Sequence, residues 1–320
     1  MSASGGSKAI IAAFLANMGI AITKFIAWAL SGSSSMLAEA VHSVADSCNQ
    51  LLLLLGGRRA KQAADKSHPF GYGRVRYVYA FVVAIVLFSI GGVFSIAEGV
   101  DKLRNPHELE NWWLPLAVLV IAIALESFSL RTAIKESRPH KGSSTWVQFI
   151  RRSKAPELPV VLLEDLAALV GLVLALCGVG LTVITGNSVF DAIGTIAIGV
   201  LLVCVAVIVG GEVKSLLVGE GASEEDVAKI EAALLDSKDI GRIIHMKTLY
   251  LGPDEFMVGA KVDIAPTTMM NEVSAIVNLA ERRIRDAVPA ASVIYIEPDI
   301  YLDPNAETPS TSSIVMLSSD

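Results

Sequence analysis

The sequence predicts an α-helical membrane bundle of six transmembrane helices, followed by a small cytoplasmic α+β domain of ferredoxin-like type. Of the 320 residues, 53% are hydrophobic and only 18% are charged, whereas an average soluble domain has about 25% charged residues. The long apolar runs also lie almost entirely in the first two thirds of the chain. We therefore expect a membrane domain at 1–211, a soluble domain at 212–303 and a polar, Ser-rich, disordered tail at 304–320.

Six stretches have the roughly 20 mostly apolar residues needed to cross a membrane; they lie at about 9–30, 35–56, 77–99, 113–134, 158–181 and 189–211. The connectors after the second and fourth stretches carry many basic residues, whereas the turns SGSS (31–34) and TGNS (185–188) carry none. Because basic loops stay in the cytoplasm, we expect both termini inside. The expected location is the plasma (inner) membrane of a bacterium.

The last third of the chain has the pattern of a soluble α+β domain. Residues 223–236 begin with a Ser N-cap and continue with helical spacing. Two strands then flank the turn Gly252-Pro253-Asp254, a helix is expected over 268–287, and ASVIYIEP is expected to form a last strand. This order of helix, strand, strand, helix and strand predicts a ferredoxin-like domain.

Other sequence features exclude several classes of protein. A net charge of -6 argues against a nucleic-acid partner. Cys48, Cys177 and Cys204 lie singly in apolar runs, so neither a disulfide framework nor a cysteine zinc site is indicated. The polar start MSASGGSK has no cleavable signal-peptide pattern, so we expect the first helix to direct membrane insertion.

The second apolar stretch carries the strongest signal for a functional site. Ionisable groups inside a membrane span are costly, so each one is a functional candidate. His42 and Asp46 are four residues apart and project from one helical face, and Glu39 extends the same stripe. An imidazole and a carboxylate one turn apart suit a first-row divalent metal ion. The alternative is a hydrogen-bonded pair that stabilises the bundle.

The fifth stretch supplies two further carboxylates. Glu164 and Asp165 lie in the apolar run VVLLEDLAALVG. Neighbouring residues of a helix point about 100° apart, so only one of these two side chains can aim squarely at a shared site. Together with His42 and Asp46, they would give three or four metal ligands from two helices.

Several motifs resemble the cation diffusion facilitators. The resemblance covers roughly residues 8–300 and rests first on GSSSMLAEAVHSVADSCNQ and HPFGYGRVRY. LEDLAAL and HMKTLYLGPDEFMVGAKVD resemble the zinc-transporter-9-like branch. The resemblance implies a transporter, not an enzyme, that exchanges Zn²⁺ for protons, with efflux from the cytoplasm favoured and no resident cofactor. It further implies a homodimer, joined through the C-terminal domain, in a lipid bilayer.

The resemblance also implies a metal site at particular positions. His42 and Asp46 match the family's ligand pair on the second helix, and Asp165 matches the second member of the pair on the fifth. The first member falls on Val161, which cannot bind a metal. Glu164 or a water is the expected fourth ligand, and Asn49 is a weaker candidate for that role.

Two secondary metal sites of the family are only partly matched. Asp65 and His68 match the site in the connector after the second helix, but Tyr72 stands where its second His is expected. In the C-terminal domain His245 and Glu297 fall near metal positions, while the other ligand positions are occupied by Ala260 and Tyr295. We therefore expect dimerisation, not metal binding, to be the task of this domain.

The expected ligands suggest a mechanism and leave alternatives open. A site of imidazole and carboxylates binds metal only when deprotonated, so protons and metal compete, and imidazole changes its protonation near neutral pH. Imidazole favours Zn²⁺ over Mn²⁺, with Fe²⁺, Co²⁺ and Cd²⁺ open as substrates. The alternatives are a membrane-embedded hydrolase, although no HExxH motif is present and Glu164 is the only candidate base, and a metal-sensing receptor without transport.

Overall fold

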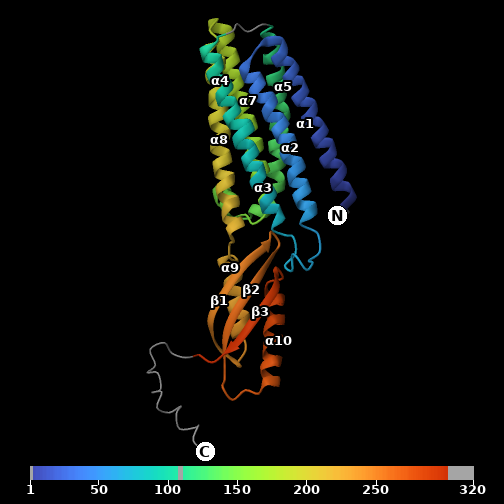
Figure 1. Cartoon of the computed structure of the whole chain (residues 1–320), viewed down its shortest axis with the longest axis vertical. Coiled ribbons are helices and arrows are strands. Elements are labelled where there is room, and N and C mark those ends of the chain that lie inside the picture. Colours follow the sequence, from blue (N-terminus) through green and yellow to red (C-terminus); the bar gives the residue numbers. More distant parts are fainter. Residues whose placement is uncertain (1–2, 107–110, 302–320) are drawn as a thin grey trace, which may run out of the picture. The chain divides into compact units, whose positions relative to one another are not determined.

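The computed structural model describes residues 3–106 and 111–301, with side chains described from residue 17 onward (Figure 1). The chain divides into two compact units. One runs to Glu220 and also takes in Leu251–Asp254, and the other consists of Gly221–Tyr250 and the residues from Glu255 onward. The predicted tail at 304–320 lies outside the described residues.

The first unit is built from long helices (Figure 1). They are α1 (Ala3–Ser31), α2 (Ser34–Arg59), α3 (Val75–Val86) continued through the π-helical segment η1 (Leu87–Val93) into α4 (Phe94–Arg104), α5 (Trp113–Lys141), α7 (Glu157–Thr185) and α8 (Val189–Val218). A short helix, α6 (Trp146–Arg152), precedes α7 and begins with a capping box between Thr145 and Gln148.

Four helical stretches of the described chain are long and apolar enough to cross a membrane. They are Val75–Arg104, Trp113–Lys141, Glu157–Thr185 and Val189–Val218. These correspond to the third to sixth predicted stretches, so a multi-pass membrane protein is confirmed. The helices α1 and α2 contain 29 and 26 residues and so have the length of a span, and their place as the first two spans belongs to the proposal below.

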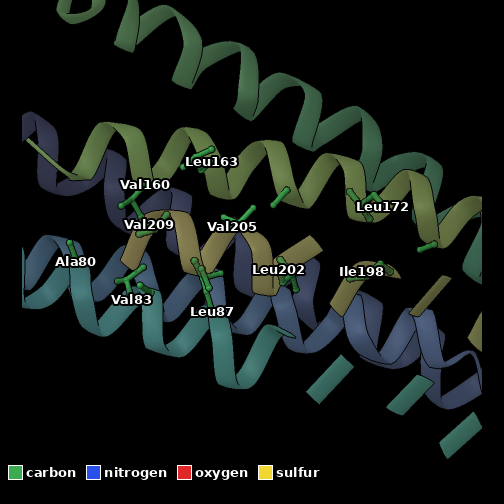
Figure 2. Packing of buried hydrophobic residues seen from close by; sticks show 14 of the residues in the cluster. Ala80, Val83, Leu87, Val160, Leu163, Leu172, Ile198, Leu202, Val205 and Val209 are labelled. Carbon is green, nitrogen blue, oxygen red and sulfur yellow. The ribbon is translucent and has the colours of Figure 1, made fainter. Parts of the chain in front are cut away.

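Helix α8 lies between α7 and the continuous α3–η1–α4 helix (Figure 2). Its Ile198, Leu202 and Val209 are buried in one apolar cluster that also contains Leu172 of α7 and Leu87 of η1. Glycine permits the close approach on the η1 side: a Cβ on Gly92 would lie 2.6 Å from the side chain of Val203, and a Cβ on Gly199 would lie 2.6 Å from Ile96. Small residues at such contacts are typical of helix packing in membranes.

The N-terminus of α2 is fixed by a buried carboxylate from α8. Asp191 accepts hydrogen bonds from the Ser33 hydroxyl (3.0 Å) and from the backbone N–H and hydroxyl of Ser34 (2.9 and 3.1 Å). Ser33 is also the N-cap of α2, its side chain accepting from the backbone N–H of Met36. The Ser33 hydroxyl oxygen and the Asp191 carboxylate therefore supply acceptors for the backbone N–H groups of this helix end.

The second unit contains α9 (Glu224–Leu235), β1 (Ile240–Gly252), β2 (Glu255–Ile264), α10 (Met270–Ala287) and β3 (Ala291–Asp299). The element order is the predicted one. The sheet has the order β1-β2-β3, and β2 and β3 are parallel, with Val258 opposite Ile294. Side chains alternate along β2 between buried and half-buried positions, and its buried face packs with Ile230 of α9 and Ile284 of α10.

Some helices extend beyond the predicted apolar stretches. α5 continues to Lys141, so the basic residues predicted to start a connector at 135 lie on its last turns. α8 continues to Val218 and crosses the expected boundary at 211–212. Helices can continue past the apolar region because Lys, Arg and Glu are good helix formers.

Candidate functional site

A stripe of buried polar residues runs along one face of α2. Glu39, His42 and Asn49 are buried, and the Asp46 side chain is 15% exposed. The Nε2 atom of His42 lies 3.5 Å from Oδ2 of Asp46, so the two predicted ligands lie side by side one turn apart.

Much of this stripe lacks hydrogen-bond partners among the described residues. Both ring nitrogens of His42, one carboxylate oxygen each of Glu39 and Asp46, and the amide oxygen of Asn49 are buried without such a partner. Buried polar atoms without a partner are rare in native proteins, and an ion that binds there is one physical reason for them.

The two carboxylates of α7 point to different neighbours. Glu164 is buried, and its Oε1 accepts a hydrogen bond from the side-chain amide of Asn49 at 2.6 Å. Asp165 accepts one from the Ser129 hydroxyl of α5 at 2.9 Å. Glu164 thus faces α2, while Asp165 faces α5, in keeping with the angle of about 100° between neighbouring helical residues. Asn49, itself a candidate ligand from the sequence, therefore donates to Glu164, the residue expected as the fourth ligand.

Sequence reasoning missed two charged residues beside this stripe. The ammonium of Lys24 in α1 lies 3.0 Å from Oε2 of Glu39 and 2.8 Å from the Ser43 hydroxyl, and it is fully buried. Glu126 of α5 lies within the range of electrostatic interaction with Asp46 and Asp165. Both are ionisable residues inside long apolar runs, so the rule that singled out His42 would have found them.

Two glycines allow neighbouring helices to pack closely against the polar stripe of α2. A Cβ on Gly91, in the π-helical segment η1, would lie 3.9 Å from Nδ1 of His42 and 3.0 Å from Leu202. A Cβ on Gly171 of α7 would lie 2.8 Å from Oε1 of Glu39. A π-helical turn within an α-helix frequently marks a functional site, and here the π-helical turn packs beside the imidazole.

The predicted ligands are neighbours but do not form a closed coordination group. Within the described parts of the chain, no three His, Cys, Asp or Glu side chains are arranged to hold a metal ion. The carboxyl groups of Asp46, Glu164 and Asp165 are nevertheless close enough to interact electrostatically. The arrangement is therefore a buried, carboxylate-rich cluster around one imidazole, and its groups can attract a divalent cation or protons.

The predicted secondary site in the connector forms a self-contained loop. Asp65 accepts hydrogen bonds from the backbone N–H groups of Ser67 and His68 (2.8 and 2.7 Å) and from the Tyr72 hydroxyl (2.7 Å). These donors, the Tyr72 hydroxyl above all, hold the pKa of Asp65 below its ordinary value. The His68 ring lies against the Tyr72 ring with centroids 4.3 Å apart.

The C-terminal residues that the resemblance relates to metal positions surround one hollow of about 470 Å³. His245, Ala260, Tyr295 and Glu297 all line it. Glu297 is paired with Lys261 at 2.9 Å, so this carboxylate already has a cationic partner.

The long apolar helices and the ionisable residues buried among them define a multi-pass membrane protein with a polar site inside its bundle. Residues 10–218 match the cation efflux transmembrane domain. The chain belongs to the cation efflux family, which consists of transporters and not of enzymes.

Relatives in animals, plants and bacteria match most of the chain. The mitochondrial proton-coupled zinc antiporter SLC30A9 of Mus musculus is 33% identical over 81% of this chain and 46% of its own length. Metal tolerance protein C4 of Arabidopsis thaliana is 31% identical over 80% of this chain and 56% of its own length. The cation-efflux pump FieF of Klebsiella pneumoniae is 24% identical over 95% of this chain and 94% of its own length. The chain thus spans about half the length of the first two relatives.

Proposed function

We propose that this protein exports divalent metal ions, Zn²⁺ first among them, across a membrane in exchange for protons. The observation that carries the proposal is the buried imidazole of His42, which has no hydrogen-bond partner among the described residues and lies beside Asp46 in a family of cation transporters. A neutral imidazole next to carboxylates is a donor set that zinc prefers.

The proposed ligand set is His42, Asp46 and Asp165, with Glu164 as the fourth ligand. Glu164 faces α2 through its hydrogen bond with Asn49, which makes it the better placed of the two α7 carboxylates. Asp165 would have to exchange its hydrogen bond from Ser129 for the metal. Asn49 orients Glu164 in this scheme, an outer role that metal sites commonly need.

Proton coupling follows from the same groups. The ligands bind a divalent ion only when they are deprotonated, so each metal that enters displaces protons and each proton that returns favours release. Several carboxyl groups close together cannot all stay charged in a poorly solvated interior without a cation. Their crowding around His42 therefore supports exchange of metal for protons.

The remaining architecture is proposed from the sequence pattern and the relatives. α1 and α2 would complete six spans with both termini in the cytoplasm, because the basic connectors lie on that side. The second unit would form the cytoplasmic domain that joins two copies of the chain. A relative is named as a proton-coupled zinc antiporter, which favours zinc, with Mn²⁺, Fe²⁺, Co²⁺ or Cd²⁺ as alternative substrates. A bacterial plasma membrane is the proposed location.

The decisive experiment is uptake of a panel of divalent metals into proteoliposomes that contain the purified protein, with an imposed pH gradient. We expect zinc uptake that stops when the gradient is collapsed, and movement of protons in the opposite direction. Zinc binding without uptake would instead favour a sensor, and hydrolytic activity without uptake would favour a membrane-embedded metalloenzyme. Either result would overturn the proposal.

A further inference from the structure

We propose that Lys24 is a positioning residue of the transport site, a tethered cation that occupies Glu39 and keeps this carboxylate out of the metal's ligand set. The inference rests on the proposed function. It concerns the ion pair between Lys24 of α1 and Glu39 of α2. Neither residue belongs to the predicted ligand set.

The ion pair is buried as deeply as any group in the bundle. Lys24 is 1% exposed and Glu39 is 0% exposed, and the ammonium lies 3.0 Å from Oε2 of the carboxylate and 2.8 Å from the Ser43 hydroxyl. A buried ion pair adds little to stability, because desolvation of both charges offsets their attraction, and well-packed apolar residues often do as well. Its presence deep in a membrane helix bundle therefore indicates a role other than stability.

Glu39 lies where a ligand could lie, and only one of its two carboxylate oxygens is paired with Lys24. Its Oε1 has no hydrogen-bond partner among the residues that the structure describes. That oxygen lies against Gly171 of α7, where a Cβ would be only 2.8 Å away. Gly171 follows Glu164 by seven residues, two turns along the same face of the helix. The free oxygen thus faces the side of α7 that carries the proposed fourth ligand.

Glu39 is also spaced to act together with His42. The two residues are three apart on α2, and a Glu and a His at this spacing project from one helical face and hold metal ions together in other helical bundles. The proposed ligand set has four members. Without Lys24, the carboxylate of Glu39 would be free to join this set as a fifth ligand. A transporter needs a site that releases its ion, and each further carboxylate makes release slower.

The charge of Lys24 also acts beyond its direct contacts. Its ammonium interacts electrostatically with His42, Asp46 and Glu126. A positive charge fixed at this place opposes the approach of a second cation and lowers the affinity of the whole group. Lys24 therefore sets the affinity for metal in two ways, by occupying Glu39 and by repulsion.

Equilibrium Zn²⁺ binding by the purified full-length protein, together with uptake in proteoliposomes, tests this assignment. Lys24→Met should bind Zn²⁺ at least about tenfold more tightly than the wild type, with lower KM and lower maximal uptake because release slows. Glu39→Gln should bind more weakly, because Lys24 is then an uncompensated cation. The double variant should bind with an affinity between those of the two single variants.

Two further variants are controls. Lys24→Arg keeps the charge and should stay near the wild-type affinity. Lys102→Met removes another buried lysine of this unit, one whose ammonium donates to the Gly32 carbonyl at 3.1 Å, and should leave Zn²⁺ affinity unchanged. If Lys24→Met does not fold but the double variant does, the Zn²⁺ affinities of Glu39→Gln and the double variant are compared instead. If neither variant that lacks Lys24 folds, the Zn²⁺ affinity of Glu39→Gln alone decides the question.

The inference is overturned if Lys24→Met binds Zn²⁺ with wild-type or lower affinity, or if Glu39→Gln binds as well as the wild type. It is equally overturned if Lys24→Met loses only thermal stability. Wild-type uptake and its loss in Asp46→Ala report on the proposed function separately. Absence of wild-type uptake would refute metal transport itself, and unchanged uptake in Asp46→Ala would show that the site lies elsewhere. If both controls behave as expected and Lys24→Met is unchanged, only the role of Lys24 is refuted.

Discussion

Two buried carboxylate clusters lie along α2, and they differ in how completely their polar atoms are used. At the start of the helix, Asp191 accepts hydrogen bonds from Ser33 and Ser34 through both of its oxygens. Two turns further on, Glu39, His42 and Asp46 keep polar atoms that have no hydrogen-bond partner among the described residues. Both clusters are costly in an apolar bundle, yet only the second keeps buried polar atoms without a hydrogen-bond partner among the described residues.

We interpret this difference as that between a structural cluster and the proposed transport site. A satisfied carboxylate fixes a helix end and gains nothing from a further ligand. A cluster with unsatisfied acceptors and several like charges is poised to bind a cation, because the cation relieves both deficits. Asp191 also lies in an apolar run, but the sequence does not reveal that its carboxylate is satisfied, since its hydrogen bonds join residues more than 150 positions apart.

The largest expected effect comes from removing a proposed ligand at the unsatisfied cluster. Asp46→Ala should reduce zinc uptake more than about 100-fold, because even outer residues of metal sites contribute about 10- to 100-fold to affinity. Uptake into proteoliposomes is the measurement, and membrane insertion should be normal. Uptake at the wild-type rate would show that the site lies elsewhere.

At the satisfied cluster, removal of the carboxylate should lower the stability of the protein and leave its zinc affinity unchanged. Asp191→Ala leaves the hydroxyl of Ser33 and the N–H and hydroxyl of Ser34 without their acceptor, and we expect a loss of about 3 kcal/mol in the free energy of unfolding. Thermal unfolding in detergent checks the loss of stability. Zinc affinity per folded molecule should not change, and a wild-type melting temperature combined with weaker zinc binding would reverse the roles of the two clusters.

A smaller effect is expected at the proposed fourth ligand. Glu164→Gln removes the charge but keeps a side chain that Asn49 can contact, and zinc should bind roughly tenfold more weakly. Isothermal titration of the purified protein with Zn²⁺ measures this. Glu98→Gln, a change outside the proposed ligand set, is the matched control. Equal affinities for Glu164→Gln and the wild type would assign the fourth position to water.

Most of the architecture could be predicted from the sequence because apolar length and spacing determine it locally. The four stretches from 77 onward and the order of helices and strands after residue 220 follow from such patterns. The π-helical turn at Leu87–Val93 could not be predicted, since it depends on the packing of Gly91 and Gly92 against α8.

The candidate site shows the same limit. The pairing of His42 with Asp46 is a matter of helical spacing, so the sequence was sufficient. The contacts of Asn49 with Glu164, of Ser129 with Asp165 and of Lys24 with Glu39 each join two helices. Such contacts depend on how the helices pack, and a single sequence contains no direct record of that.

The smallest expected effect extends the comparison to an exposed carboxylate in the connector. Tyr72→Phe removes the hydroxyl that donates to Asp65, so the pKa of Asp65 should rise toward its ordinary value. In the wild type this pKa is lowered, so the contribution of the charged carboxylate to loop order is present near neutral pH and lost as pH falls through that pKa. Carboxyl ¹³C NMR measures the shift, with Tyr295→Phe in the other unit as the control. An unchanged pKa in Tyr72→Phe would assign the effect to the backbone N–H groups of Ser67 and His68.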